Sequence, residues 1–108
     1  MSDFFKPEKI HKIIIKISGE ILGNPQGGGL YLPSVNNLIE EIIPVKNMGY
    51  SLGIVLGGGN IFRGGSDLGS NLNRFTADDI GMLATIQNAL LLSDRLNKMN
   101  YQTEIYSA

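Results

Sequence analysis

The sequence predicts an α/β fold in which a mainly parallel sheet is wound with helices. Segment 12–18 is β-branched and almost continuously apolar, as expected for a strand buried on both faces of a parallel sheet. Further along, segments with helical spacing alternate with strand-like segments, in the order strand, helix, strand, helix, strand. With 108 residues and 43% apolar content the chain can fill one small core, so we expect at most one domain.

The first helix is predicted to begin at Ser34, which can cap the first turn, and to end before Gly49. It follows a glycine-rich segment, 23–29, that reads as a flexible loop. Pro44 removes one helical N–H, so we expect a kink or an early end near Ile43. The apolar positions that recur at helical spacing are Val35, Leu38, Ile39, Ile42 and Ile43.

The second half of the chain repeats the strand and helix pattern. Segment 51–56 predicts a second strand, and segment 64–71 predicts a long, mobile connection. A second helix is expected with Thr76 at its cap and Asp79 three residues later. The loose alternation over 101–106 predicts a third strand.

Composition excludes several classes of function. Nine basic and ten acidic residues give a net charge of −1 without a basic block, so nucleic acid is not expected as a ligand. The absence of cysteine excludes disulfides and thiolate metal sites. Segment 1–7 lacks the features of a signal peptide, which favours the cytoplasm. No apolar run approaches the roughly 20 residues of a membrane-spanning helix, so no membrane partner is expected.

A run of three glycines, 57–59, directly follows the second strand and precedes Arg63. Glycines let a ligand approach backbone N–H groups, and arginine offers a fork of donors to an anion, so the run indicates phosphate binding. Ligands of wound parallel sheets bind beyond the carboxyl ends of the strands, and segment 16–20 ends the first strand. We therefore expect both loops to border one crevice. Lys16 interrupts an apolar run where a buried ammonium needs a partner, and that partner could be the ligand.

Two common phosphate motifs do not fit. A dinucleotide fingerprint that starts at Gly57 would need glycine where Phe62 stands. A P-loop that starts at Gly59 would need lysine where Gly65 stands. Structural explanations remain open for each residue: Lys16 as a lysine extended into water, the glycines as a tight turn, and Asp78 as a helix-capping acid.

Three motifs together resemble those of bacterial uridylate kinases, within the amino acid kinase superfamily. They are Lys16-Ile17-Ser18-Gly19-Glu20, Gly57-Gly58-Gly59-Asn60-Ile61-Phe62-Arg63-Gly64 and Asn73-Arg74-x-x-x-Asp78-x-x-Gly81-Met82-Leu83-Ala84-Thr85-x-x-Asn88. The resemblance runs from about Lys12 to Tyr106. It implies a three-layer α/β/α fold with a mainly parallel sheet, of which residues 1–108 would be the N-terminal part of a single amino acid kinase domain with its C-terminal half absent.

The resemblance implies ATP-dependent phosphorylation of UMP to UDP with Mg²⁺, a step of pyrimidine nucleotide biosynthesis. It also implies a homohexamer that GTP activates and UTP inhibits. Because such kinases are roughly twice as long, we expect the 108-residue chain alone to be inactive. The alternatives are a non-catalytic nucleotide-binding or assembly module, and a superfamily enzyme with another acceptor such as aspartate, acetylglutamate or carbamate.

Site residues are carried over from the resemblance by position. Catalytic roles fall to Lys16 and Arg63. The implied ATP-binding residues are Lys16, Ile17, Ser18, Gly19, Gly59 and Arg63. UMP would be held by Gly58 and Asp78. A loop tied to GTP activation would comprise Asn24, Pro25, Gln26, Gly27, Gly28 and Gly29. No residue is assigned to a metal.

Overall fold

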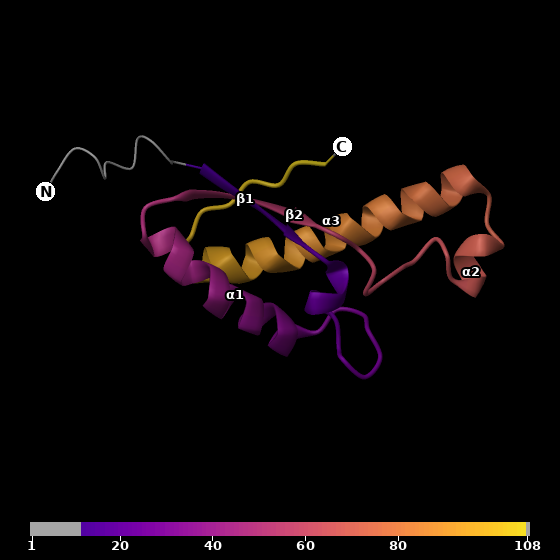
Figure 1. Ribbon diagram of the computed structural model, residues 1–108, viewed down its shortest axis with the longest axis horizontal. Helices are drawn as coiled ribbons and strands as arrows, with labels where there is room; N and C mark the ends of the chain where they lie inside the picture. Colours follow the sequence, from indigo (N-terminus) through magenta and orange to yellow (C-terminus); the bar gives the residue numbers. More distant parts are fainter. Residues whose placement is uncertain (1–11, 108) are drawn as a thin grey trace, which may run out of the picture.

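The computed structural model describes residues 12–107, so the start that was examined for a signal peptide lies outside the described residues. Its elements in chain order (Figure 1) are β1 (Lys12–Ile17), η3 (Gly19–Leu22), α1 (Leu32–Asn47), β2 (Ser51–Leu56), α2 (Asp67–Ser70) and α3 (Arg74–Lys98). The strands pair in parallel, from Lys12 opposite Ser51 to Ile17 opposite Leu56. The first two of the three predicted strands are thus confirmed, and so is the α/β class with a parallel sheet.

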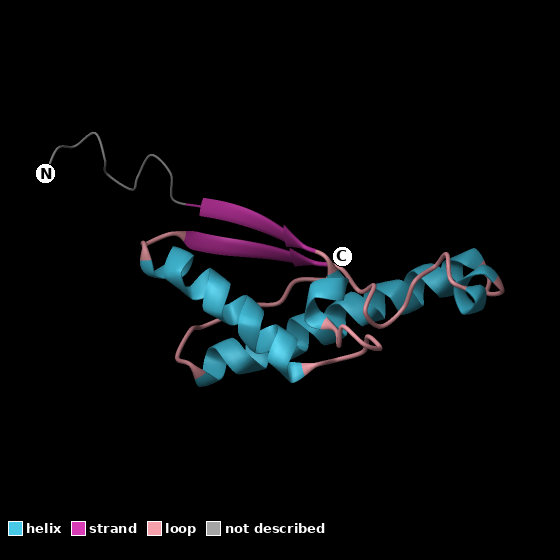
Figure 2. Ribbon diagram, turned by 60° about the horizontal axis from the view of Figure 1, so that its bottom comes forward, coloured by secondary structure: helices cyan, strands magenta, loops and turns pink. Residues whose placement is uncertain are grey.

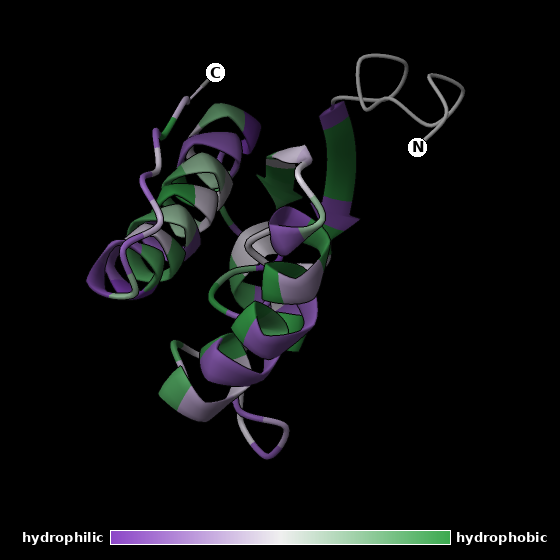
Figure 3. Cartoon of the chain, turned by 90° about the vertical axis from the view of Figure 1, so that its left-hand side faces the viewer, coloured by the Kyte–Doolittle hydropathy of each residue, from purple (hydrophilic) through white to green (hydrophobic). Residues whose placement is uncertain are grey.

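The long helices α1 and α3 lie on the same side of the two-stranded sheet (Figure 2). Apolar side chains between these elements form the core: Ile17, Leu22, Val35, Leu38, Ile39, Ile42, Leu92 and Leu96. The opposite face of the sheet is open, since Ile14 is 74% exposed and Val55 is 52% exposed. The prediction that the first strand is buried on both faces is therefore wrong for the described residues, which cover only one face. Apolar residues nevertheless fill the middle of β1 (Figure 3).

Helix α1 begins before its predicted start and continues through Pro44. Tyr31 is the N-cap residue and Pro33 stands in the first turn, where its missing N–H costs no helical hydrogen bond. Ser34 Oγ instead donates to the Gly23 carbonyl, 2.8 Å away, and so holds the preceding loop. The helix continues past Pro44, whose side chain is exposed, so the early end was wrong. Gly49, at φ +101°, ends the helix as predicted.

Helix α3 begins two residues before the predicted cap. Asn73 is the N-cap, and its Oδ1 accepts a hydrogen bond from Phe75 N at 2.9 Å, so the assignment of this role to Thr76 was wrong. The connection before it holds one helical turn, α2, which Ser66 caps by accepting from Gly69 N at 3.1 Å. Within residues 12–107, no helix is long and apolar enough to span a bilayer.

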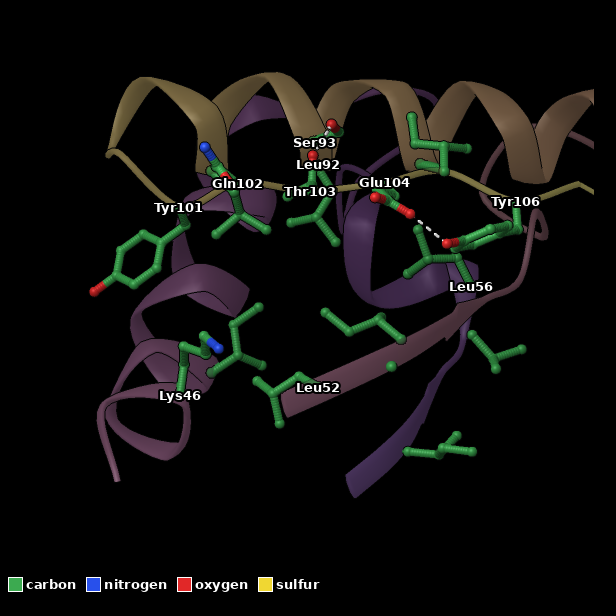
Figure 4. Close-up of a pocket in the computed structure, with 18 of the residues that line it drawn as sticks. Lys46, Leu52, Leu56, Leu92, Ser93, Tyr101, Gln102, Thr103, Glu104 and Tyr106 are labelled. Atoms are coloured by element: carbon green, nitrogen blue, oxygen red, sulfur yellow. Dashed lines mark hydrogen bonds between the residues drawn. The ribbon is translucent and has the colours of Figure 1, made fainter. Parts of the chain in front are cut away.

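The predicted third strand does not form. Residues 101–107 pair with neither described strand; Figure 4 shows residues 101–106 turning back beside α3. Tyr101 N donates to Leu96 O at 3.0 Å, and the hydroxyls of Ser93 and Thr103 are hydrogen-bonded. Tyr101 N and the Thr103 hydroxyl are thus bonded to the helix, and no backbone hydrogen bond joins residues 102–107 to either described strand.

Candidate functional site

The carboxyl ends of β1 and β2 bring two loops into contact. Gly57 N donates to Ile17 O at 2.9 Å and so extends the parallel ladder one residue beyond β2. The backbones then touch: a Cβ on Gly19 would lie 2.6 Å from Gly59 N, a distance that no side chain tolerates. The expectation that both loops border one place is confirmed. Glycine is required at residue 19 because of this approach.

An ion pair spans the two loops. The Arg63 guanidinium contacts the Glu20 carboxylate, and both side chains are more than half exposed. Ser18 Oγ donates to Glu20 Oε1 at 3.0 Å. The pKa of Glu20 is held below its ordinary value mainly by this hydrogen bond and, to a smaller extent, by the charge of Arg63. Arg63 thereby lies beside the glycine run, since a Cβ on Gly59 would be 3.4 Å from its Nη2.

The glycine run offers backbone donors. The Gly58 carbonyl accepts hydrogen bonds from Ile61 N at 2.9 Å and Phe62 N at 3.0 Å, which closes the turn. The N–H groups of Gly58, Gly59 and Asn60 donate to no acceptor among residues 12–107. Successive free N–H groups next to an arginine are suited to an anion such as phosphate.

One face of α3 is shaped to receive the glycine run. Gly81, Ala84 and Asn88 recur at helical spacing and therefore lie on one side of the helix. A Cβ on Gly58 would lie only 2.8 Å from Ala84 Cβ, and a Cβ on Gly81 would meet the Phe62 ring at 4.0 Å. The small side chains at these positions let the loop approach the helix, which explains why glycine and alanine stand in the Gly-Met-Leu-Ala-Thr block.

Two buried asparagines, 9% and 1% exposed, join the loop to α3. Asn60 Nδ2 donates to Asn88 Oδ1 at 3.0 Å, and Asn88 Nδ2 donates to Asn60 Oδ1 at 2.8 Å. The second hydrogen of each amide reaches a backbone carbonyl, Gly29 O from Asn60 and Gly57 O from Asn88. Neither asparagine was expected in the site from the sequence alone. The available signal was Asn88, a polar residue seven positions after Gly81 on the face that carries Ala84.

The predicted site residues are not all brought together. Ser18, Gly19, Gly59 and Arg63 meet at the strand ends, whereas the side chain of Ile17 is buried in the core. Among the described residues, no hydrogen bond or ion pair involves the side chain of Lys16 or of Asp78, and both side chains are exposed.

Lys16 and Asp78 differ from their predictions for separate reasons. Lys16 stands opposite Val55 on the open face of the sheet, so it does not bear the burial cost expected for a lysine in an apolar run. Asp78 lies in the second turn of α3 rather than the first, because the helix begins at Arg74. It precedes Gly81 by three residues, about 60° around the helix from it, and its side chain is exposed.

The loop over 24–29 is attached to the same place. Gly29 and Asn60 are joined by two hydrogen bonds: Gly29 N donates to Asn60 O at 2.6 Å, and Asn60 Nδ2 donates to Gly29 O. Gly28 and Gly29 have φ of +74° and +75°, a conformation that favours glycine. The loop thus contacts the residue that follows the glycine run.

No group of three or more histidine, cysteine, aspartate or glutamate side chains among residues 12–107 could hold a metal ion. The carboxylate beside the glycine run is that of Glu20, whose Oε1 would lie 2.9 Å from a Cβ on Gly59. A divalent cation would therefore depend on ligand phosphates and water for most of its coordination.

A separate groove of about 670 Å³ lies between β2, α3 and residues 101–106 (Figure 4). Its lining is mainly apolar and includes Leu52, Leu56 and Leu92, with Glu104 and Tyr106 at one end. The hydrogen bond to Glu104, more than its charge, raises the pKa of the Tyr106 hydroxyl. No arginine is among the residues that line this groove, in contrast to the strand ends.

The family model described as "Amino acid kinase family" matches residues 11–108. The chain belongs to the amino acid kinase family. It is 42% identical over 104 residues to a uridylate kinase of Francisella tularensis and 43% identical over 98 residues to one of Ruegeria. These alignments cover 95% and 91% of this chain but 42% and 39% of the relatives. This amino acid kinase chain therefore spans less than half the length of those relatives.

Solved structures of the family agree with this fold. The UMP kinase of Ureaplasma parvum superimposes with a TM-score of 0.76 at 40% identity, over 86% of this chain and 41% of that one. The UMP kinase of Bacillus anthracis gives 0.73 at 36% identity, over 81% and 36%. The arrangement of strands and helices is thus that of the amino acid kinase fold, present here as part of the domain.

Proposed function

We propose that the protein is the N-terminal part of an ATP-dependent uridylate kinase, which transfers a phosphoryl group to UMP and forms UDP. The observation that carries the proposal is the junction of Gly57–Gly59 and Arg63 with Ser18–Gly19 at the ends of two parallel strands. The names of the relatives support UMP as the acceptor.

The phosphates of ATP would lie along the free N–H groups of the glycine run. Phosphoryl transfer depends on positioning and on positive charge near the transferred oxygens, and needs no covalent nucleophile. Arg63 would supply that charge while Glu20 and Ser18 hold its guanidinium in place. Lys16 would have to reach the phosphates from the open face of the sheet. The ATP-binding residues we propose are Lys16, Ile17, Ser18, Gly19, Gly59 and Arg63.

Mg²⁺ would neutralise charge on the phosphate oxygens of bound ATP. The described residues fit a cation that the nucleotide carries with it, since they offer one nearby carboxylate rather than a cage. The protein's own part is to hold the phosphates with backbone N–H groups and Arg63.

UMP would be held by Gly58 and Asp78. Gly58 packs against α3 at Ala84, and Asp78 stands on the same helix three residues before Gly81. The exposed Asp78 carboxylate would accept hydrogen bonds from ribose hydroxyls. In this proposal the acceptor would lie along α3 and the donor at the strand ends.

The remaining family properties are proposals for the whole protein. We propose residues 1–108 as part of one amino acid kinase domain, a homohexamer in the cytoplasm, and a role in pyrimidine nucleotide biosynthesis. Loop 24–29 is proposed for GTP activation, with UTP as an inhibitor. Because the chain spans 42% of the Francisella relative, we propose that it is inactive alone.

The test is ADP release in a coupled assay with UMP, CMP and dCMP as acceptors. It uses this chain and a chain extended past Ala108, each with and without Arg63→Ala. UMP-selective turnover of the extended chain that falls at least about tenfold in Arg63→Ala would support the proposal. A folded extended chain that binds ADP without turnover would indicate a nucleotide-binding module, and turnover with another acceptor would indicate another kinase of the family.

A further inference from the structure

The two asparagines that join the glycine run to α3 have one possible orientation. Each Nδ2 group faces a backbone carbonyl, Gly29 O at 2.9 Å from Asn60 and Gly57 O at 2.8 Å from Asn88. Turning either amide by 180° would set an oxygen against a carbonyl oxygen and would break the reciprocal pair. The four hydrogen bonds are therefore satisfied together or lost together.

The bond to Gly57 determines the direction of the next N–H group. The peptide between Gly57 and Gly58 is trans and planar, so its C=O and N–H point in opposite directions. Asn88 holds the carbonyl toward α3 and the buried amide pair. The N–H of Gly58 consequently points away from the pair, and it has no acceptor among residues 12–107.

The pair also joins the second glycine-rich loop to the first. Asn60 binds Gly29 through both its side chain and its backbone carbonyl, at 2.9 and 2.6 Å. The space around it is tightly filled: a Cβ on Gly23 would lie 2.8 Å from Asn60 Cβ, and one on Gly19 would lie 2.7 Å from its Oδ1. Any movement of Asn60 must therefore move its neighbours.

We propose that Asn60 and Asn88 are positioning residues that preset the phosphate loop. They hold the Gly57 carbonyl inward, so the N–H of Gly58 is presented to an anion before the anion binds, and they fix Gly29 to the same unit. The inference rests on the proposed nucleotide site, but the hydrogen bonds that it requires are all made by this chain's own residues. A preset loop binds phosphate without first ordering its own backbone.

The first experiment uses the unmodified 108-residue chain without ligand. Hydrogen exchange of the side-chain NH₂ groups is followed by ¹⁵N NMR, with the exposed Asn36 of α1 as the internal reference. We expect both pair amides to exchange at least about a hundredfold more slowly than Asn36, because both are buried and fully bonded. Exchange as fast as that of Asn36 would overturn the proposal without any variant.

The second experiment compares Asn88→Asp with Asn36→Asp, which makes the same change on the exposed face of α1. Aspartate keeps the shape of Asn88 but removes its N–H donors. We expect the amide resonances of Gly58 and Gly59 to shift without ligand, and ADP affinity to fall about tenfold or more in titrations. Asn36→Asp should change neither.

Outcomes separate this inference from the proposed function. If the unmodified chain binds ADP and a folded Asn88→Asp binds it equally well, the positioning role is overturned while the nucleotide site stands. If the unmodified chain binds neither ADP nor tripolyphosphate, the nucleotide site of this chain fails and the positioning role fails with it. If Asn88→Asp does not fold, Asn60→Asp replaces it, with the exchange of the unmodified chain as the deciding measurement.

Discussion

Replacing Gly58 with alanine tests whether the glycine run is held against α3. The new Cβ would lie 2.8 Å from Ala84 Cβ and 3.1 Å from Thr85 N. Distances below 3.0 Å require movement, and neither neighbour moves easily, because one is buried at 1% exposure and the other is helix backbone. Overpacking of this kind costs about 1–3 kcal/mol of unfolding free energy. Each kcal/mol lowers the Tm of a domain of this size by about 4–8 °C.

The assay is urea unfolding of the 108-residue chain followed by circular dichroism, with Gly65→Ala as the matched control. A Cβ on Gly65 would meet nothing within 4 Å, so this change should stay within about 0.5 kcal/mol. Ala84→Gly removes the nearest methyl group. The loss of unfolding free energy in the double variant Gly58→Ala/Ala84→Gly should therefore be about 0.5–3 kcal/mol smaller than the sum of the losses in the two single variants. Equal stability of Gly58→Ala and Gly65→Ala, or additivity in the double variant, would refute the reasoning.

Two further predictions concern the ion pair and the core. Ser18→Ala should raise the pKa of Glu20 toward its ordinary value, because the Ser18 hydrogen bond is the main cause of its lowering. Since the folded-state pKa of Glu20 is lowered, ionised Glu20 contributes stability above its unfolded-state pKa, and this stability is lost as pH falls through the folded-state pKa. A Glu20 midpoint that is the same in Ser18→Ala as in the unmodified chain, measured by ¹³C NMR titration of the carboxyl group, would contradict the prediction. Ile39→Ala, at a side chain 2% exposed, should cost about 2–5 kcal/mol, whereas Ile14→Ala, on the open sheet face, should cost about 1 kcal/mol or less. Urea unfolding measures both, and equal costs would contradict the assigned core.

Local patterns predicted the elements whose own residues decide them. The β-branched run at 12–18 and the apolar segment 51–56 formed strands, and the glycine run followed the second as expected. The loops after the two strands were expected to lie side by side, because ligands of a wound parallel sheet bind beyond the carboxyl ends of its strands. The contact between Gly19 and Gly59 is the consequence.

The errors fall where distant residues compete with local ones. Ser34 has the chemistry of a cap but bonds Gly23, eleven residues earlier. Asn60 and Asn88 are 28 positions apart, and no spacing rule pairs them. Segment 101–106 alternates like a strand, yet Tyr101 N and the Thr103 hydroxyl bond to α3 and the segment does not pair with the sheet. Lys16 lies within the expected strand, but the sequence alone did not reveal that its face of the sheet is uncovered.

Helix α3 contributes residues to both the core and the candidate site, so the direction in which each part of the helix faces affects the site. Leu92 and Leu96 anchor its later half in the core, while Gly81, Ala84 and Asn88 face the glycine run. One residue inserted between Asn88 and Leu92 would rotate the earlier half by about 100° and turn the loop-facing residues away. Seven inserted residues would return the phase to within about 20° but shift the face by about 10 Å along the axis. The helix therefore fixes both the angle and the distance between the core and the loop, and an insertion that restores the angle still changes the distance.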